Sequence, residues 1–304
     1  MYIIILHQMV VMAIYAGIGC VLRKAGLLTK EGNRCVSNLL LYVILPCVIV
    51  NSFLRPNDAE TTNALVIALG IGILLVAVAM ALSTLCFRKE PVDNFSSSFS
   101  NAGFMGIPLI AATLGSQYVL YTAAFVAIVN ILQWTYGQHI MSETGEKVRF
   151  SVKKLVLNPL VIALLAGLLL YFLPITIPDI ATSCITTIAG CNAPVAMIIL
   201  GYYLCELPFK KFFSLPAAYG VCAVRLTAIP LASILVLALI PGLSVEIKSA
   251  MLICAAAPVG SNVAIYAERN GQDYSRAVIM VCLSTIFSIV SMPLMILLLT
   301  LICR

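Results

Sequence analysis

The chain has 304 residues, of which 62% are hydrophobic and 10% are charged, and its formal net charge is +6. A soluble domain carries roughly 25% charged residues, so this composition excludes an ordinary soluble protein and predicts an all-α polytopic membrane protein. Long apolar runs also exclude a transmembrane β-barrel, whose strands are short and alternate in polarity. The basic residues lie in loops between the runs, so the positive charge does not indicate a nucleic-acid partner.

Ten apolar segments follow one another along the chain, each of roughly the 20 residues that a membrane-spanning helix needs. They cover about residues 3–22, 36–53, 64–87, 95–114, 118–139, 157–173, 180–205, 217–240, 247–267 and 277–302. The longest charged stretch, residues 142–154, separates the fifth segment from the sixth. Together the segments leave no room for a soluble domain, and they predict a multi-pass protein embedded in the lipid bilayer.

Two of these segments contain residues that break helices. The fourth contains Asn101-Ala-Gly-Phe-Met-Gly-Ile-Pro108, and the ninth contains Ala255-Ala-Ala-Pro-Val-Gly-Ser-Asn262. Proline removes a backbone donor, and glycine disfavours helical order. In a bilayer the freed backbone groups must be satisfied by protein or by a water-filled cavity, so the paired interruptions predict a transporter binding site. For either segment taken alone, a kinked helix is the alternative.

Three landmarks recur at nearly the same offset in the two halves of the chain. They are Pro46 with Pro194, 148 residues apart, and two pairs 150 residues apart, Pro108 with Pro258 and Gly17 with Gly167. This spacing predicts two five-helix repeats, residues 1–140 and 155–304. Because each repeat has an odd number of spans, the two would enter the membrane in opposite orientations and form an inverted repeat.

The distribution of basic residues predicts the orientation in the membrane. Fourteen of the 18 Lys and Arg residues lie in the loops after odd-numbered spans, whereas Arg55, Lys248 and Arg304 lie on the opposite side. The positive-inside rule then places the odd-numbered loops in the cytoplasm and both termini outside the cell membrane. Arg225 lies inside the eighth span. A charge in this position lines a functional cavity or serves a structural role, such as donating to carbonyls freed near Pro230.

Uncharged polar residues near the interruptions are candidates for a substrate site. The N-termini of half-helices present free N–H groups and partial positive charge, which attract an anion such as a carboxylate. Asn101 can donate an amide N–H to this anion, although each asparagine could instead cap its own broken helix. The predicted substrate-binding residues are Asn101, Gly103, Gly106, Pro108, Pro258, Gly260, Ser261 and Asn262. Further candidates for lining the cavity are Asn51, Ser52, Asn130, Gln133, Asn192 and Arg225.

The remaining titratable residues do not indicate an enzyme. None of the 12 acidic residues lies near the centre of a predicted span, where proton pumps and cation carriers place a carboxylate. The 11 cysteines form no C-x-x-C motif, and His7 and His139 are isolated, so neither a metal site, a catalytic residue nor a cofactor is predicted. The cysteines are expected to be small core residues. The coupling ion, Na⁺ or H⁺, stays open.

Three stretches together resemble the auxin efflux carrier family, which includes plant auxin exporters and bacterial malate-permease-like proteins. They are Asn101-Ala-Gly-Phe-Met-Gly-Ile-Pro-Leu109, Ala257-Pro-Val-Gly260 continuing through Tyr266-Ala-Glu-Arg-Asn270, and Val224-Arg-Leu-Thr-Ala-Ile-Pro230. The resemblance covers essentially the whole chain. It implies a homodimer in which helices 1, 2, 6 and 7 form a scaffold and helices 3–5 and 8–10 form a transport unit. The short central loop lacks the long regulatory segment of plant exporters.

The resemblance further implies elevator-type alternating access, with a carboxylate bound where helices 4 and 9 cross. We therefore expect a secondary transporter of small organic anions, auxin-like or dicarboxylate. A sodium-coupled organic-anion symporter of the related bile-acid type shares the crossed, broken helices, and an anion channel would also need polar interruptions. A membrane enzyme is not favoured, because the chain has no H-E-x-x-H motif and no paired intramembrane aspartates.

Overall fold

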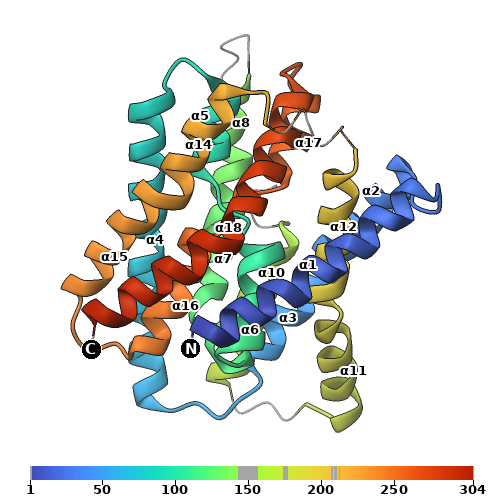
Figure 1. Ribbon diagram of the computed structural model, residues 1–304. Coiled ribbons are helices and arrows are strands. Elements are labelled where there is room, and N and C mark those ends of the chain that lie inside the picture. Colours follow the sequence, from blue (N-terminus) through green and yellow to red (C-terminus); the bar gives the residue numbers. More distant parts are fainter. Residues whose placement is uncertain are drawn as a thin grey trace.

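The computed structural model describes residues 2–142, 157–173, 177–206, 208, 211 and 213–303. In these ranges the chain is a bundle of helices without strands, and its one β pairing is an isolated bridge (Figure 1). The prediction of an all-α membrane protein is confirmed. Seven of the described helical segments are long and apolar enough to cross a membrane, and two shorter ones are also apolar. The ten-span inverted repeat stays a prediction.

The first half of the chain consists of α-helices joined by short turns and by π- or 3-10-helical segments. These elements are α1 (Tyr2–Lys24), α2 (Lys30–Leu39), η1 (Leu40–Ile44), α3 (Leu45–Phe53), α4 (Ala59–Phe87), α5 (Pro91–Ser98), η2 (Ala102–Gly106), α6 (Ile107–Thr113), η3 (Ser116–Tyr118), α7 (Val119–Leu132), η4 (Gln133–Gly137) and α8 (Gln138–Met141).

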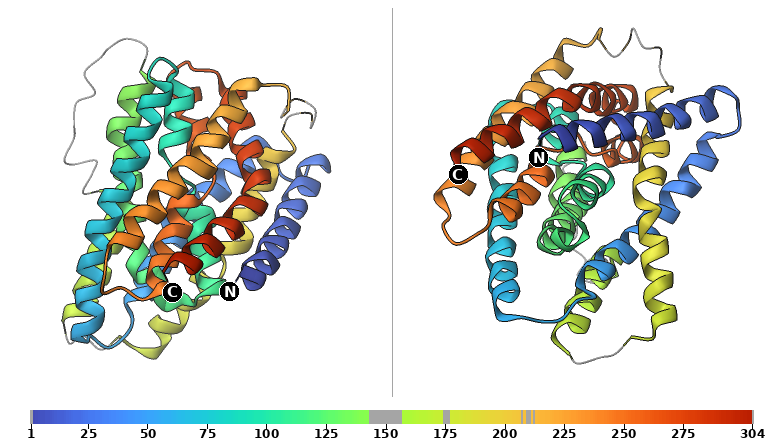
Figure 2. Two further views of the ribbon diagram at one scale, coloured as in Figure 1. Left: turned by 60° about the vertical axis from the view of Figure 1, so that its left-hand side comes forward. Right: turned by 60° about the horizontal axis from the view of Figure 1, so that its bottom comes forward.

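The second half is built in the same way. Its described elements are α10 (Pro159–Phe172), α11 (Asp179–Gly190), α12 (Asn192–Leu204), α14 (Pro216–Ala223), η5 (Val224–Ala228), α15 (Ile229–Leu239), α16 (Val245–Ala256), α17 (Asn262–Arg269) and α18 (Tyr274–Ile302). In Figure 2, α1 packs against α12 on one side of the molecule, while α4 and α15 stand on the other side.

Several helices begin earlier than the apolar runs predicted, because polar residues form their first turns. Helix α4 begins at Ala59, and the carboxylate of Asp58 caps it by accepting the hydroxyl of Thr61 at 2.6 Å and its backbone N–H at 2.7 Å. These hydrogen bonds hold the pKa of the Asp58 carboxyl below its usual range. Thr29 caps α2 in the same way. Side-chain caps satisfy N–H groups at helix starts, and hydropathy alone does not detect them.

Three of the prolines inside the helical segments share one local arrangement. Each follows a π-helix that ends two residues earlier: η1 before Pro46, η2 before Pro108 and η5 before Pro230. In each case the N–H of the residue just before the proline donates to the carbonyl five residues back, from Leu45 to Leu40, Ile107 to Ala102 and Ile229 to Val224. The wider turn accommodates the lost donor and the bulk of the ring.

Because Pro108 lies within a continuous helical segment, the break in the fourth span is not at the position predicted. The non-helical residues are 99–101, between α5 and η2, whereas Gly103, Gly106 and Pro108 belong to helical segments. In the ninth span the break covers residues 257–261 and does contain Pro258 and Gly260. The prediction located both interruptions in the right segments, but in the fourth span it placed the break several residues too late.

The two breaks lie side by side and satisfy each other's backbone groups. The N–H of Asn101 donates to the carbonyl of Pro258 at 2.8 Å, and the N–H of Gly260 donates to the carbonyl of Phe99 at 3.0 Å. An isolated antiparallel bridge between Ser100 and Val259 lies within this pairing. Backbone groups at membrane depth need such partners, so the pairing allows both helices to open.

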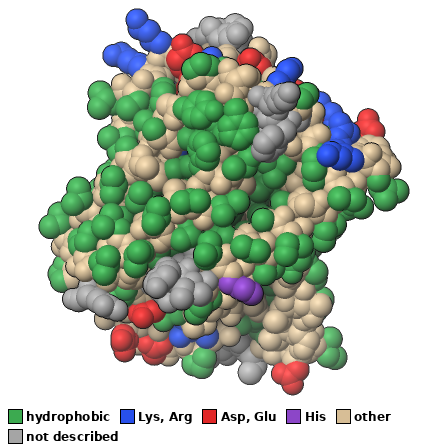
Figure 3. Space-filling model, in the orientation of Figure 1, with side chains coloured by type: hydrophobic (Ala, Val, Ile, Leu, Met, Phe, Trp, Pro, Cys, Tyr) green, Lys and Arg blue, Asp and Glu red, His purple; other side chains and the backbone are tan. Residues whose placement is uncertain are grey.

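The outer surface agrees with a membrane location. Hydrophobic side chains cover the middle of the face shown in Figure 3, and most of the Lys and Arg side chains visible there lie at its upper end. Both chain termini lie at the lower end in Figure 1. Large apolar side chains such as Val21, Val66 and Leu235 are exposed, as expected for positions that face lipid.

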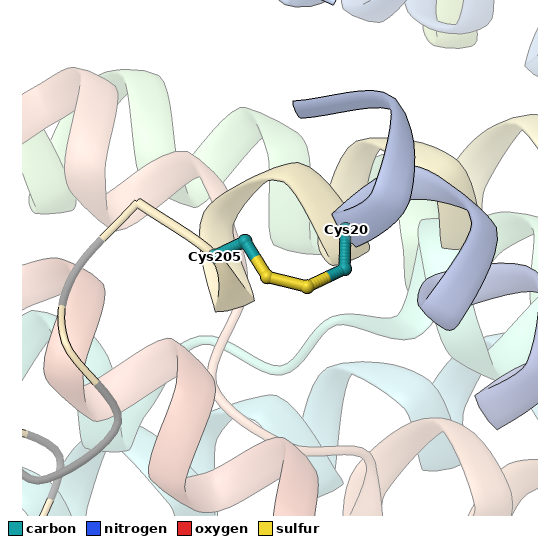
Figure 4. The surroundings of a disulfide bond; sticks show 2 residues. All are labelled: Cys20 and Cys205. Carbon is teal, nitrogen blue, oxygen red and sulfur yellow. A yellow bond between two sulfur atoms is a disulfide. The ribbon is translucent and has the colours of Figure 1, made fainter. Parts of the chain in front are cut away.

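The expectation that the cysteines are small core residues is wrong for most of them. Cys20 and Cys205 form a disulfide that joins α1 to the end of α12, with their Cα atoms 5.2 Å apart (Figure 4). The exposed free cysteines are Cys35, Cys86, Cys184 and Cys191, and the buried ones are Cys222, Cys254 and Cys282. In a membrane protein both the core and the lipid-facing surface are apolar, so hydropathy does not separate them.

Candidate functional site

A small pocket lies where the two breaks meet. Its volume is about 20 Å³, which is room for roughly one water molecule. It brings together seven of the predicted site residues: Asn101, Gly103, Asn130, Gln133, Gly260, Ser261 and Asn262. The other lining residues, which sequence reasoning missed, are Leu41, Leu45, Ser100, Ala102, Phe104, Val126 and Val129. None of these described lining residues is charged.

Asn101 is a polar residue of this pocket whose side-chain amide nitrogen makes no hydrogen bond within the described residues. The residue is 5% exposed, and its Nδ2 has no hydrogen-bond partner among the described residues. Its backbone carbonyl accepts from the N–H groups of Met105 and Gly106, and its side chain makes no capping bond to η2. A buried donor without a partner is costly, so this amide is suited to receive an acceptor from a ligand. The hydroxyl of Ser100, 4% exposed, also lacks a partner in the described part of the chain.

The other amides of the pocket are already oriented by protein contacts. Asn262 donates from Nδ2 to Oε1 of Gln133 at 2.9 Å, and Asn130 donates from Nδ2 to the carbonyl of Val126 at 2.8 Å. An amide nitrogen carries two N–H groups, so each asparagine keeps a second donor. The pocket therefore offers several neutral donors held in fixed positions, as an oxyanion requires.

Gly260 allows the two breaks to approach each other. A Cβ at this position would lie 3.3 Å from the carbonyl oxygens of both Phe99 and Ser100. Such contacts are tighter than ordinary packing and would push the two breaks apart. Gly103 also lines the pocket, whereas Gly106 does not: a Cβ there would lie 3.4 Å from the sulfur of Cys254 on α16. Gly106 therefore serves helix packing.

Arg225 does not line the pocket. Its side chain is 1% exposed and donates only to backbone carbonyls: Nε to Ala257 at 3.1 Å, Nη1 to Ser97 at 3.0 Å and to Ser98 at 3.4 Å, and Nη2 to Ala255. These carbonyls lie at the C-terminal ends of α5 and α16, where the partial charge is negative. Donation to the carbonyls near Pro230, which the sequence suggested, is not among these hydrogen bonds.

The remaining candidates lie elsewhere. Asn51 and Ser52 line a separate cavity of about 420 Å³ together with Arg55 and Asp58, and Oδ1 of Asn51 accepts from the hydroxyl of Thr186 at 2.8 Å. Asn192 is buried at the start of α12, and its Oδ1 has no partner within the described ranges. Pro108 is buried in α6, and Pro258 contributes its carbonyl to Asn101.

A larger cavity of about 370 Å³ adjoins the pocket and shares three of its lining residues, Leu41, Asn130 and Asn262. Arg269 is the one charged residue among the described residues that line it. Its guanidinium lies 5.8 Å from the ring centroid of Trp134, and no ion pair of Arg269 occurs within the described residues. Trp134 is the only tryptophan of the chain, and its position next to Gln133 was a signal that sequence reasoning left unused.

The sequence profile of the family described as "Membrane transport protein" matches residues 4–296. The chain belongs to this family. It is the auxin efflux carrier family that the three motifs resemble, and a transporter of this family is not an enzyme. The chain is 23% identical over 274 residues to a protein of Rhizobium meliloti named "Putative malonate transporter", covering 85% of this chain and 84% of the relative. It is 25% identical over 291 residues to an "Uncharacterized transporter" of Methanothermobacter thermautotrophicus, covering 91% and 92%.

Proposed function

We propose that this member of the membrane transport protein family is a secondary transporter of small organic anions that binds a carboxylate where the two helix breaks meet. The observation that carries the proposal is the free Nδ2 donor of Asn101, buried at the pocket between the breaks. A carboxylate oxygen would satisfy this donor and accept further N–H groups from the neighbouring asparagines. The hydroxyl of Ser100 offers one more donor.

The charges around the two cavities favour an anion. The small pocket has no charged lining residue among those described, and the larger cavity has a guanidinium and no carboxylate among them. A volume of about 370 Å³ lies within the range of roughly 300–1,000 Å³ typical of small-molecule sites. The substrate would occupy the larger cavity, with one carboxylate directed into the small pocket.

A dicarboxylate fits this arrangement best. Asn262 and Arg269 lie on the same helix, α17, and both line the larger cavity. They are seven residues apart, which is about 10 Å along a helix, and a flexible arginine side chain can shorten this separation. One carboxylate would bind at Asn101 and Asn262, and the other would pair with Arg269. The name of the Rhizobium relative agrees with a short dicarboxylate.

The proposed architecture has ten spans in two inverted five-helix repeats. The scaffold would comprise α1, α2–α3, α10 and α11–α12, and the transport unit would comprise α4–α8 and α14–α18. The pocket would lie at the boundary between them, since Leu41 and Leu45 belong to the proposed scaffold and the breaks to the proposed transport unit. An exposed ion pair, Lys30 with Glu268 at 2.8 Å, would also cross this boundary. Exposed pairs are weak, so such a contact can open during elevator-type movement.

We further propose that the protein is a homodimer in the cell membrane with both termini outside. The excess of Lys and Arg in the odd-numbered loops supports this orientation. The two termini lie at one end of the molecule, opposite the end where most of the visible Lys and Arg side chains gather (Figures 1 and 3). The larger cavity, which Arg269 lines, would then face the cytoplasm.

The test is equilibrium binding of malonate, malate and indole-3-acetate to the purified protein and its Asn101→Ala variant. A hydrogen bond to a charged group contributes about 1.5–3 kcal/mol, so the variant should bind its carboxylate roughly 10- to 150-fold more weakly. Asn33→Ala is the matched control, because Asn33 is also buried with an unpartnered amide atom but lines none of the cavities described above. Equal affinity of wild type and a folded Asn101→Ala variant would contradict the proposal.

Flux measurements in proteoliposomes separate a carrier from an anion channel. A carrier shows saturation and trans-stimulation, because each substrate crosses with one movement of the protein. Flux that stays linear to high substrate concentration would indicate a channel instead.

A further inference from the structure

Arg225 joins the C-terminal ends of both half-helices that precede the breaks. Its guanidinium donates to the carbonyls of Ser97 and Ser98 at the end of α5, and to those of Ala255 and Ala257 at the end of α16. No carboxylate contacts this side chain within the described residues. A fully buried cation is thus stabilised by four backbone carbonyls from segments far apart in the sequence.

Carbonyls at the ends of broken transmembrane helices are suited to bind a small cation. In transporters with discontinuous helices, half-helix C-termini and unwound carbonyls coordinate the coupling Na⁺, while half-helix N-termini face the anionic substrate. Here the helix N-termini that would face the anionic substrate are present, because η2 and α17 begin at the pocket. The C-terminal carbonyls that would coordinate Na⁺ are occupied by Arg225.

We propose that Arg225 is a tethered cation that takes the place of a coupling sodium ion. The inference rests on the proposed function, and it specifies how that transport is energised: the carbonyl site is permanently filled, so substrate binding and movement require no Na⁺. A guanidinium remains protonated at all physiological pH values, so the same residue does not exchange a proton during the cycle.

The tethered charge also acts on the substrate pocket. Ser98 is three residues from Asn101, which is at most about 11 Å of extended chain. In the low-dielectric interior a charge at this range is poorly screened, so the guanidinium favours an anion on the other side of the break. The transport unit with a bound monoanion would carry no net charge at the breaks, and the empty unit would carry one positive charge.

Thermal unfolding of the detergent-solubilised protein tests the proposal without any substrate. Wild type should have the same midpoint in sodium chloride and in choline chloride. Arg225→Ala should unfold several degrees lower in choline chloride, because four buried carbonyls lose their donor. A few millimolar guanidinium should restore part of the loss in a saturable manner, since an ion that binds only the folded state stabilises it.

Two further variants make the result specific. Arg225→Lys retains the positive charge but lacks the fork of donors, so it should have an intermediate midpoint and no response to guanidinium. Arg34→Ala removes an exposed arginine and should respond to neither ion. Saturable stabilisation of Arg225→Ala by guanidinium or sodium supports the proposal, and the absence of both overturns it.

If Arg225→Ala does not fold, two measurements on the wild-type protein test the proposal. Binding of radioactive ²²Na⁺ to the purified protein should not exceed that of a denatured sample, and the unfolding midpoint should not depend on sodium. Saturable sodium binding by wild type would overturn the tethered-cation role. These measurements contain no carboxylate, so they test the role of Arg225 separately from anion binding at Asn101. Either hypothesis can therefore be contradicted while the other still holds.

Discussion

The backbone N–H of Asn101 donates to the carbonyl oxygen of Pro258 at 2.8 Å. This bond joins two helix breaks from opposite halves of the chain, and it fixes the side chain of Asn101 at the wall of the pocket. The backbone of Asn101 supports the break while its side-chain donor stays free. The same residue therefore links the structural reason for the interruption to the proposed recognition of an anion.

Gly260→Ala should weaken the pairing of the two breaks. Its Cβ would press against the carbonyls of Phe99 and Ser100, and overpacking of this kind costs about 1–3 kcal/mol. We expect a lower unfolding midpoint and weaker carboxylate binding, measured in detergent. Gly70→Ala in α4 is the control, because a Cβ there has open space and alanine favours the helix. Unchanged stability and affinity of Gly260→Ala would show that the pairing tolerates a wider separation.

Gly201→Ala should destabilise the contact between α1 and α12. A Cβ at Gly201 would overlap the backbone carbonyl of Ala16, so the two helices would have to separate. Small residues permit close helix packing in membranes, and their loss removes van der Waals contact. Gly17→Ala on α1 is the matched control, since nothing lies within 4 Å of its Cβ. Thermal unfolding that is equal for the two variants would argue against a tight α1–α12 contact.

Arg269→Gln should discriminate between dicarboxylates and monocarboxylates. Loss of a charge-assisted hydrogen bond of about 1.5–3 kcal/mol lowers dicarboxylate affinity roughly 10- to 150-fold, whereas a monocarboxylate held only at Asn101 should be affected much less. Competition binding with malonate and acetate measures both. Arg88→Gln removes an exposed arginine that lines none of the described cavities and serves as the control. An equal loss for both ligand classes would place Arg269 outside the substrate site.

Membrane potential alone should drive export of a monoanion. An inside-negative potential favours outward movement of negative charge by about 2.3 kcal/mol per charge per 100 mV. Neither cavity that we assign to the substrate has a carboxylate among its described lining residues that could carry a compensating proton. Proteoliposomes with a potassium-diffusion potential, and without sodium or pH gradients, provide the measurement. Flux that does not depend on the potential, or that occurs only with sodium, would contradict this expectation. Proteoliposomes with the Asn101→Ala variant serve as the control for flux that does not involve the proposed site.

The sequence by itself determined the class of protein, an all-α membrane protein, and its family. These properties depend on local features: the length of an apolar run, the position of charges between runs, and the motifs around Asn101, Arg225 and Pro258. Seven of the residues predicted for the site line one pocket in the structure. Most of them lie at or beside the two breaks, because helix-breaking residues mark where a membrane protein opens its backbone.

Only the tertiary structure decided which groups meet. A proline in the sequence shows that a backbone donor is missing, but not how the helix compensates for it. The π-helix before Pro108 compensates, so the break lies at residues 99–101 and not at the proline. Hydropathy treats lipid-facing and buried positions alike, so it did not separate the exposed cysteines from the buried ones. The contacts of Arg225 join three segments separated by long stretches of chain. Such contacts depend on the packing of helices against one another, and no local pattern in the sequence carries that information.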